Sequence, residues 1–267
     1  MGIERVLERF SLAGRRAVIT DIGRGPAQEV APLLADAGAT IVVVNPDKVL
    51  AVELAGRIQA DCGKAAALPC ELADETAVQD LFAQVDALHG APDILVNCAA
   101  LTLNHPFAET SLEQLDIQFS ANLRAPFLLM REAVKRMVAA GKGGRIVNIS
   151  TMGAEHPVLS GNAIYSASRA ALNMMCRNIA HDHLGDRIFV NAVLPGAFSG
   201  KVTMHEDTLA RIKAGHAVTG PVMQPGRMPL GYGDPWDIAS AVLYLVGPSG
   251  GFITGQTITL DGGFLLT

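Results

Sequence analysis

The sequence contains little cysteine and no arrangement of cysteine or histidine typical of a metal site. Its four cysteines, Cys62, Cys70, Cys98 and Cys176, lack C-x-x-C spacing, and the seven histidines include no H-E-x-x-H pair. Structural and catalytic zinc sites usually need such closely spaced ligands. We therefore expect no metal, and we expect free thiols in a reducing compartment, which predicts a cytoplasmic location.

Clustered positive charge and long apolar runs are also missing. The net charge is −5 and no basic run stands out, which disfavours nucleic acid as a partner because phosphate binding requires clustered Lys and Arg. No uninterrupted apolar stretch approaches the ~20 residues of a membrane-spanning helix, and the first ten residues do not resemble a signal peptide. With 267 residues, 49% of them hydrophobic, the chain can bury one large core.

Short β-branched runs alternate with longer helical patterns along the whole chain. Several runs, such as residues 41–44, are apolar on both faces, as expected when helices cover both sides of a parallel sheet. No linker divides the chain. We therefore predict an α/β fold with a doubly wound parallel sheet, as a single Rossmann-like domain spanning residues 1–267. The predicted strands are 17–20, 40–44, 65–68, 94–97, 145–150, 189–194 and 257–260, and the predicted helices are 26–37, 48–60, 75–88, 112–139, 163–183 and 235–246.

Two segments depart from this alternation. Pro126 lies inside the predicted helix 112–139 and predicts a kink or break there. Residues 199–233 are rich in Gly, Pro and Met and follow a strand. Irregular segments of this length are usually lids or flexible loops, and open α/β sheets bind ligands where their strands end. We therefore predict a substrate lid at 199–233.

Tyr165 and Arg169 lie four residues apart in the predicted helix 163–183. Residues at this spacing share one helix face, so both side chains can reach one bound molecule. A cation beside a tyrosine stabilises the phenolate, which suits an acid/base for a carbonyl–alcohol pair. Short motifs also arise by chance, so a half-buried tyrosine with a solvated arginine is the alternative.

The turn after the first predicted strand is glycine-rich and leads into a helix, where a dinucleotide's pyrophosphate would rest on backbone N–H groups. Its candidate binding residues are Asp21, Ile22, Arg24, Gly25 and Pro26. The negative charge of Asp21 should weaken phosphate binding, and a plain strand–helix turn is the alternative.

Asn45, at the end of the second predicted strand, is the candidate contact for the adenosine ribose. An amide can hydrogen-bond a ribose without repelling a 2′-phosphate, and Arg24 could attract one. The cofactor expected from these residues is NAD or NADP, with a lean toward NADP.

Several segments together resemble the short-chain dehydrogenase/reductase family in order and spacing, over nearly the whole chain. The matching segments are residues 10–20, 93–100, 122–127, 144–151, 165–169, 190–196 and 254–263. The resemblance implies an NAD(P)-dependent oxidoreductase with a Rossmann-like sheet. It also implies a homo-oligomer, since dimers and tetramers are common in that family.

The resemblance assigns catalytic roles to five positions. The tyrosine matching Tyr165 exchanges a proton with the substrate oxygen, and the residue matching Arg169 binds the nicotinamide ribose. Asn122 matches an asparagine that supports a proton-relay water. A hydroxyl where the strand ends polarises the same oxygen. Strand register favours Thr151 in this role, whereas counting back from the following glycine selects Ser150.

The resemblance also implies further cofactor contacts and reveals departures from the family. Glu71 and Leu72 would flank adenine, Asn97 and Ala99 would lie beside a ribose, and Pro195 and Gly196 would border the nicotinamide. Only the middle glycine of the family's turn, Gly25, remains, and Arg169 replaces a lysine. Arginine keeps the positive charge but cannot release a proton into a relay.

Two hypotheses follow. The preferred one is a dehydrogenase or reductase that transfers a hydride between the nicotinamide and a small or medium, largely apolar alcohol or ketone. The alternative is a relative with lost or weak catalysis that serves as a binding or oligomer-forming subunit. His105, His156 and His205 could border a substrate cleft, although lone loop histidines are more often solvated or structural.

Overall fold

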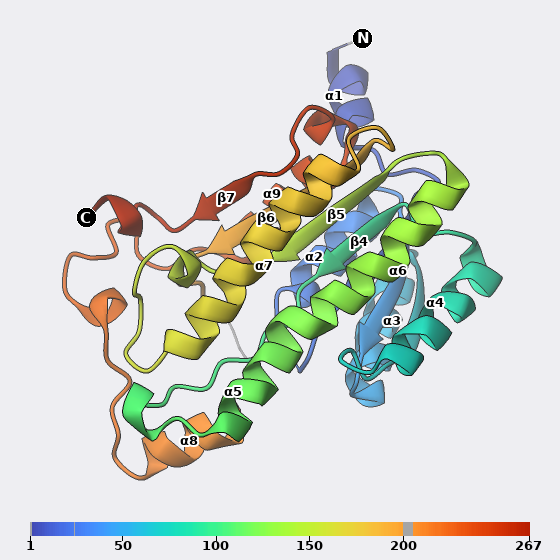
Figure 1. The fold of residues 1–267 in the computed structure, drawn as a ribbon. Coiled ribbons are helices and arrows are strands. Elements are labelled where there is room, and N and C mark those ends of the chain that lie inside the picture. The colour runs from blue at the N-terminus through green and yellow to red at the C-terminus, as the bar shows by residue number, and fades with distance from the viewer. Residues whose placement is uncertain (1, 24, 200–204) are drawn as a thin grey trace.

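The computed structural model describes residues 2–23, 25–199 and 205–267. Its strands form one parallel sheet in the order β3-β2-β1-β4-β5-β6-β7, which confirms the predicted doubly wound fold. Figure 1 labels β4 to β7 of this sheet. The strands are β1 (Arg16–Thr20), β2 (Thr40–Asn45), β3 (Lys64–Pro69), β4 (Ile94–Asn97), β5 (Gly144–Ile149), β6 (Ile188–Pro195) and β7 (Thr257–Leu260). The order reverses between β1 and β4, and in open α/β sheets such a point is where ligands bind.

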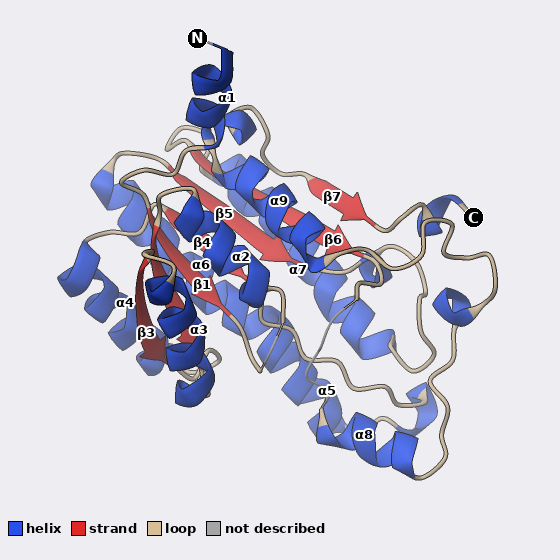
Figure 2. Cartoon of the chain, turned by 180° about the vertical axis from the view of Figure 1, so that it is seen from behind, coloured by secondary structure: helices blue, strands red, loops and turns tan. Residues whose placement is uncertain are grey.

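Helices cover both faces of the sheet (Figures 1 and 2). One face carries α2 (Ala27–Asp36), α3 (Lys48–Ala60) and α9 (Pro235–Val246), and the other carries α4 (Glu75–His89), α6 (Ala125–Ala140) and α7 (Ala163–Asp182). Successive strand residues face opposite layers, since Ile19 packs in the first layer and Val18 in the second. Each buried aliphatic side chain contributes about 1.5–3 kcal/mol to stability, so both layers hold the strand ends in place.

The helix predicted over residues 112–139 is interrupted. It consists of α5 (Leu112–Phe119), a π-helical turn (Ser120–Arg124) and α6. Pro126 lies in the first turn of α6, where the N–H group that proline lacks is not needed by the helix. The chain therefore shows a change of helix type just before Pro126 rather than a break, because the backbone stays helical from α5 through the π turn into α6.

Two helices were not predicted: α1 (Gly2–Phe10) and α8 (Glu206–Lys213). The prediction of an irregular segment over 199–233 is therefore wrong within α8. Helices α5 and α8 lie side by side at the end of the molecule opposite α1 (Figures 1 and 2). Short 3-10 turns occur at Phe107–Glu109, Met152–Ala154, Pro221–Met223, Pro248–Gly250 and Phe264–Leu266. None of the described helices is both long and apolar enough to cross a membrane.

Candidate active site

A ladder of polar side chains joins three strands where they end. Thr20, Asn97 and Asn148 occupy paired positions on β1, β4 and β5. The Thr20 hydroxyl donates to the Asn97 side-chain carbonyl at 3.3 Å, and the Asn97 amide donates to the Asn148 carbonyl at 2.8 Å. All three side chains are buried. The ladder fixes the carboxyl edge of the sheet, by which we mean the ends of the strands and the loops that leave them.

Arg169 reaches this edge from α7 and is almost completely buried, with 1% of its surface exposed. Its Nη2 donates to the Ala99 carbonyl at 2.7 Å, and its Cζ lies 5.7 Å from the centre of the Tyr165 ring. Its Nε has no hydrogen-bond partner within the described residues. Burial lowers the pKa of this guanidinium, and the interaction with Tyr165 partly offsets that effect. The predicted pairing of Tyr165 with Arg169 is therefore present, and the alternative of a solvated arginine is wrong.

Asn122 clamps the loop that Arg169 contacts. Its side-chain oxygen accepts from the Leu101 N–H at 2.8 Å, and its side-chain N–H donates to the Leu101 carbonyl at 2.7 Å. Asn122 is fully buried and lies in the π turn, a feature that is frequent at functional sites. The double hydrogen bond holds the loop after β4 in one position, two residues beyond Ala99.

The two candidate hydroxyls differ in their surroundings. Thr151 is half-buried, and its Oγ1 accepts from the Gly153 N–H at 3.1 Å. A methyl group added to Gly153 would lie 3.3 Å from the Thr151 hydroxyl and 3.4 Å from that of Ser166, so Thr151 borders the helical turn that carries Tyr165. Ser150 is buried, and its hydroxyl has no partner within the described residues. Accessibility to a substrate favours Thr151.

Asp21 sits inside the glycine turn and is only 4% exposed. Its carboxylate accepts from the N–H groups of Ile22 at 2.8 Å and Gly25 at 3.0 Å. Any Cβ at position 25 would come within 2.8 Å of that carboxylate, which explains why glycine is needed there. Burial raises the pKa of the Asp21 carboxyl to about 7, and backbone N–H groups offset only part of this effect. The turn is therefore folded around its own carboxylate.

Asn45 holds Gly23 of the turn. Its amide N–H donates to the Gly23 carbonyl and its oxygen accepts from the Asp47 N–H, both at 3.0 Å. Asn45 thus ties the end of β2 to the turn. Pro26 directly precedes α2 and has no N–H to offer a phosphate. Arg24, the other predicted phosphate contact, lies outside the described residues.

The other predicted cofactor contacts line the same edge. Leu72 is buried and Glu71 is exposed beside it, just after β3. Pro195 ends β6, and a Cβ on Gly196 would lie 3.2 Å from the sulfur of Met152. This close approach brings the end of β6 against the turn that follows the two candidate hydroxyls.

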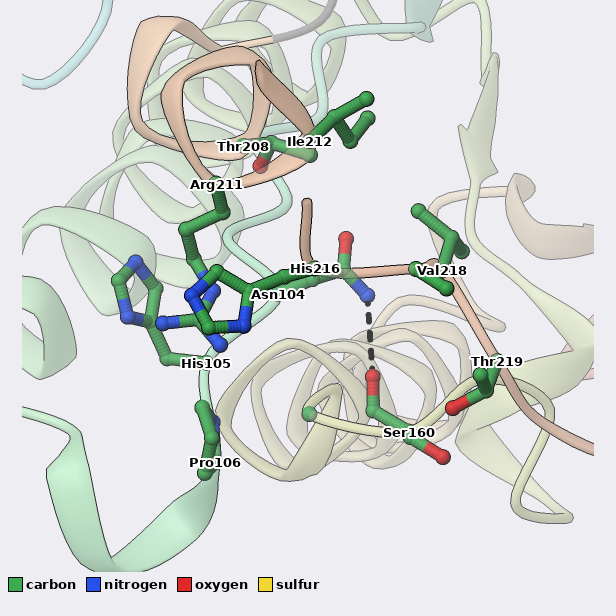
Figure 3. A pocket seen from close by; sticks show the side chains of 12 residues that line it. Asn104, His105, Pro106, Ser160, Thr208, Arg211, Ile212, His216, Val218 and Thr219 are labelled. Atoms are coloured by element: carbon green, nitrogen blue, oxygen red, sulfur yellow. Dashed lines mark hydrogen bonds between the residues drawn. The ribbon is translucent and has the colours of Figure 1, made fainter. Parts of the chain in front are cut away.

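A cavity of about 260 Å³ lies between α8 and the loops that follow β4 and β5. Figure 3 shows the basic side chains of His105, Arg211 and His216 gathered on one side and Ser160 and Thr219 on the other.

Hydrogen bonds connect this cavity to α7. Asn104 donates to the Ser160 carbonyl at 3.3 Å and also to Asn162, the N-cap residue of α7. The cavity therefore adjoins the first turn of the helix that carries Tyr165.

Sequence reasoning found His105 but missed Arg211 and His216, because both lie in the segment predicted to be irregular. The other two candidate histidines have structural contacts. His205 caps α8, with its Nδ1 3.3 Å from the Asp207 nitrogen, and His156 packs edge-on against the Phe264 ring. No cluster of three potential metal ligands occurs among the residues that the structure describes.

The carboxyl edge fits a dinucleotide at its ribose end, where the buried Arg169 approaches the loop at Ala99 and its Nε has no partner among the residues that the structure describes. The glycine-rich turn after β1 fits the pyrophosphate of a dinucleotide less well. Its two backbone donors point inward as required, yet they bind the Asp21 carboxylate.

Similar proteins share this architecture over their full length. A family model described as enoyl-(acyl carrier protein) reductase matches residues 22–265. L-xylulose reductase from Mesocricetus auratus is 31% identical over 97% of this chain and 99% of its own length. The solved structure of a dehydrogenase/reductase from Sinorhizobium meliloti superposes with a TM-score of 0.84 and 31% identity, covering 98% of this chain and 99% of its own.

A gluconate 5-dehydrogenase from Burkholderia cenocepacia, solved in complex with NADP and tartrate, also has a TM-score of 0.84, at 27% identity, covering 98% of this chain and 99% of its own. These proteins are named as reductases and dehydrogenases. The alternative of a non-catalytic subunit is therefore not favoured.

Proposed function

Since the chain belongs to the short-chain dehydrogenase/reductase family and is an NAD(P)-dependent oxidoreductase, we propose that Tyr165 is its acid/base and that its substrate is a small polar alcohol or ketone. The observation that carries the proposal is the buried Arg169, which lies beside the Tyr165 ring and binds the Ala99 carbonyl at 2.7 Å. It supports the proposal because a cation beside the phenol would stabilise the phenolate, and we infer that the ribose of the cofactor binds at this point.

In the reductive direction, Tyr165 donates its proton to the carbonyl oxygen as that oxygen gains negative charge. Arg169 stabilises the phenolate that remains. The Thr151 hydroxyl donates a hydrogen bond to the same oxygen. Bound NAD(P)H supplies the hydride to the carbonyl carbon, so the products are an alcohol and NAD(P)⁺. Because a guanidinium keeps its proton, Tyr165 regains its own from water.

Asn122 acts as a positioning residue in this scheme. Its two hydrogen bonds to Leu101 hold the loop that presents the Ala99 carbonyl to Arg169. Displacement of this loop would move the cation relative to the phenol, and acid/base catalysis depends strongly on such alignment.

The lining of the cavity supports a polar substrate rather than the apolar one expected from the sequence. Arg211 and two histidines line it, and Arg211 forms an ion pair with Glu109, with 3.6 Å between Arg211 Nη1 and Glu109 Oε2. Such a lining favours a hydroxyl-rich or carboxylate-bearing ligand. Two relatives are named for xylulose and gluconate, both rich in hydroxyl groups, and gluconate also carries a carboxylate.

We also propose that residues 199–233 form the substrate lid. The segment leaves the sheet and returns at one place, because the Ser199 N–H donates to the Gly233 carbonyl at 2.9 Å and the Gly233 N–H donates to the Ala197 carbonyl at 3.0 Å. Between these points, α8 and the loop after it cover the cavity.

Three finer properties belong to this proposal: NADP as the preferred cofactor, a cytoplasmic location and a homo-oligomer. The neutral Asn45 where the adenosine ribose would lie supports NADP, and four free cysteines, three of them buried, support a reducing compartment. Exposed apolar side chains on α5 and α6, including Ile117, Phe127 and Val138, support self-association. Light scattering after size-exclusion chromatography tests the last point, and a monomer at micromolar concentration would contradict it.

The acid/base role is tested by oxidation of NADPH and NADH with xylulose, 5-ketogluconate and cyclohexanone as substrates. Replacing Tyr165 with Phe should lower kcat by roughly 10²- to 10⁴-fold and leave nucleotide binding unchanged. The matched control is Tyr244→Phe on α9, far from the carboxyl edge, which should change neither. Full activity in the Tyr165 variant would refute its role.

The substrate class is tested with Arg211→Ala. We expect a KM for 5-ketogluconate at least tenfold higher, with the KM for cyclohexanone unchanged. Lys213→Ala, an exposed cation on the same helix outside the cavity lining, is the control. Equal effects on both substrates would exclude Arg211 as a carboxylate contact.

A further inference from the structure

The turn that should receive the pyrophosphate of a dinucleotide already contains an anion. The two oxygens of Asp21 accept from the backbone N–H groups of Ile22 and Gly25, at 2.8 and 3.0 Å. Inward-pointing N–H groups at a helix N-terminus are the elements that bind phosphate in this type of fold. These two N–H groups of the turn therefore already have an anionic partner, the carboxylate of Asp21.

The geometry leaves little room for both anions. An added Cβ at Gly25 would meet the carboxylate at 2.8 Å, so the turn is closed tightly around Asp21. Pro26 follows at the start of the helix without an N–H, which removes one further donor that a phosphate could use instead. Two negative charges in one buried turn also repel each other strongly.

We propose that Asp21 is an internal competitor for the pyrophosphate, so that a dinucleotide binds only when Asp21 takes up a proton or its carboxylate leaves the turn. This inference rests on the proposed function, because it takes the nucleotide cofactor as the ligand. It goes further by assigning to one residue the control of cofactor affinity and its dependence on pH.

The surroundings of Asp21 favour proton uptake. Glu29 on α2 adds negative charge nearby, and Arg57 offsets part of the charge of Glu29. Cys98, just after β4, is fully buried and lies close enough to Asp21 to feel its charge. Burial is the main cause that raises the pKa of the Cys98 thiol well above its ordinary value, and the charge of Asp21 adds to this effect. Burial raises the pKa of Asp21 to about 7, so its carboxyl changes charge within the physiological range.

The sign of the pH dependence follows directly. Below pH 7 the Asp21 carboxyl is mostly neutral, and the pyrophosphate competes with no charge. Above pH 7 the carboxylate is ionised, and each further pH unit should weaken dinucleotide binding by up to tenfold, because the proton must be taken up on binding. Binding at pH 8 should therefore be accompanied by the uptake of close to one proton.

Isothermal titration calorimetry on the purified chain tests this dependence of dinucleotide binding on pH. NADH is the probe, because it lacks the 2′-phosphate of NADPH, and phosphate monoesters titrate near pH 6 themselves. Titrations at several values between pH 5.5 and 9, each in two buffers of different ionisation enthalpy, give both Kd and the number of protons taken up. We expect Kd to rise at least tenfold between pH 7 and 8.5, with proton uptake approaching one.

Variants test whether Asp21 is the group that takes up the proton when NADH binds. In Asp21→Asn the pH dependence and the proton uptake should disappear. In Asp21→Gly the Kd at pH 8 should fall at least tenfold below that of the wild type, since the two N–H donors become free. Glu29→Gln removes a nearby carboxylate and serves as the control, which should keep the uptake of about one proton.

The outcomes separate this inference from the proposed function. A Kd for NADH that is independent of pH in the wild type, or proton uptake that persists in Asp21→Asn, would overturn the role of Asp21 while leaving the cofactor intact. Absence of NADH and NADPH binding in the wild type and in Asp21→Gly at every pH would instead overturn the proposed function. The calorimetric measurement on the wild type needs no variant, so poor folding of a variant does not remove the test.

Discussion

The two edges of the sheet differ in whether their buried charged side chains form ion pairs. At the amino edge, where the strands begin, the buried carboxylate of Asp93 accepts from Arg16 Nε at 2.8 Å and lies 3.4 Å from Arg15 Nη1. At the carboxyl edge, neither Asp21 nor Arg169 forms an ion pair with any residue that the structure describes. Within the described part of the chain, the buried carboxylate at the amino edge is paired with two arginines, whereas Asp21 and Arg169 at the carboxyl edge form hydrogen bonds with backbone groups.

This difference separates stability from function within one sheet. A buried charge without a counter-ion costs stability, and among the described residues Asp21 and Arg169 have none. Perturbed titratable groups cluster at functional sites. We therefore expect changes at the amino edge to alter the free energy of unfolding and changes at the carboxyl edge to alter binding or catalysis.

The largest expected effect concerns the dependence of stability on pH at Asp21. Its folded-state pKa is raised from 3.8 to about 7, so its favourable contribution is complete below pH 3.8 and is lost as pH rises toward 7. Each pH unit in this window corresponds to about 1.4 kcal/mol. The free energy of unfolding of the wild type should therefore fall by about 3 kcal/mol relative to Asp21→Asn between pH 5 and 8.

Urea unfolding at pH 5, 6, 7 and 8 measures this difference. Asp93→Asn, at the other edge, keeps Asp21 and provides the comparison, so its free energy of unfolding should fall between pH 5 and 8 by as much as that of the wild type. If the wild type and Asp21→Asn change in parallel, Asp21 does not titrate in the folded state and the contrast between the edges is wrong.

The second effect distinguishes the two hydroxyls at the end of β5. Thr151→Ala should lower kcat roughly 100-fold, because it removes a hydrogen-bond donor to the oxygen that gains charge. Ser150→Ala should leave kcat unchanged and keep or slightly raise the stability, since its buried hydroxyl has no partner among the described residues and is costly to bury.

Steady-state kinetics and thermal unfolding of both variants measure these effects. The reverse result, with loss of activity in Ser150→Ala alone, would assign the catalytic hydroxyl to Ser150. It would also show that the register of the strand is a poor guide to the residue that follows it.

The third effect belongs to the amino edge. Asp93→Asn should lower the free energy of unfolding by about 2 kcal/mol, because it leaves Arg15 and Arg16 without their carboxylate. The kcat and KM should not change. Asp86→Asn, which removes a half-exposed pair with Arg136, is the control and should cost less than about 1 kcal/mol. A loss of activity in Asp93→Asn at constant stability would break the separation between the edges.

The sequence predicts the sheet well because its strands carry a strong signal. Runs such as residues 41–44 are apolar on both faces, which fits only a strand covered on both sides. The structure places β4, β7, α3 and α9 at the predicted bounds.

Helix α8 was missed because it buries little beyond Thr208 and so lacks apolar periodicity. Its only signal is acidic residues in the first turn and basic residues in the last.

The candidate site could be predicted as a set of positions but not as an arrangement. The spacing of Tyr165 and Arg169 predicts that they share a helix face, yet the burial of Arg169 depends on the loop after β4 that packs over it. The negative charge of Asp21 is visible in the sequence. That its carboxylate folds back onto the N–H groups of its own turn depends on backbone angles that no residue pattern specifies.

The smallest expected effect is that of Arg169→Lys, which restores the lysine that the family normally has at this position. Lysine keeps the positive charge beside Tyr165, so kcat should be unchanged or raised by less than about tenfold. Burial lowers the pKa of a lysine, so the variant should lose activity at high pH as its ammonium deprotonates. The wild type should show no such decline from this position, because a guanidinium stays charged there.

A profile of kcat from pH 6 to 10.5 measures the expected loss of activity of Arg169→Lys at high pH. Arg145→Lys, at the start of β5 and stacked on Phe189 with its Cζ 4.1 Å from the ring centre, is the matched control at the amino edge and should leave the profile unchanged. Complete loss of activity in Arg169→Lys would show that catalysis needs the planar guanidinium itself. Its hydrogen bond to Ala99, rather than its charge, would then be what the carboxyl edge requires of this residue.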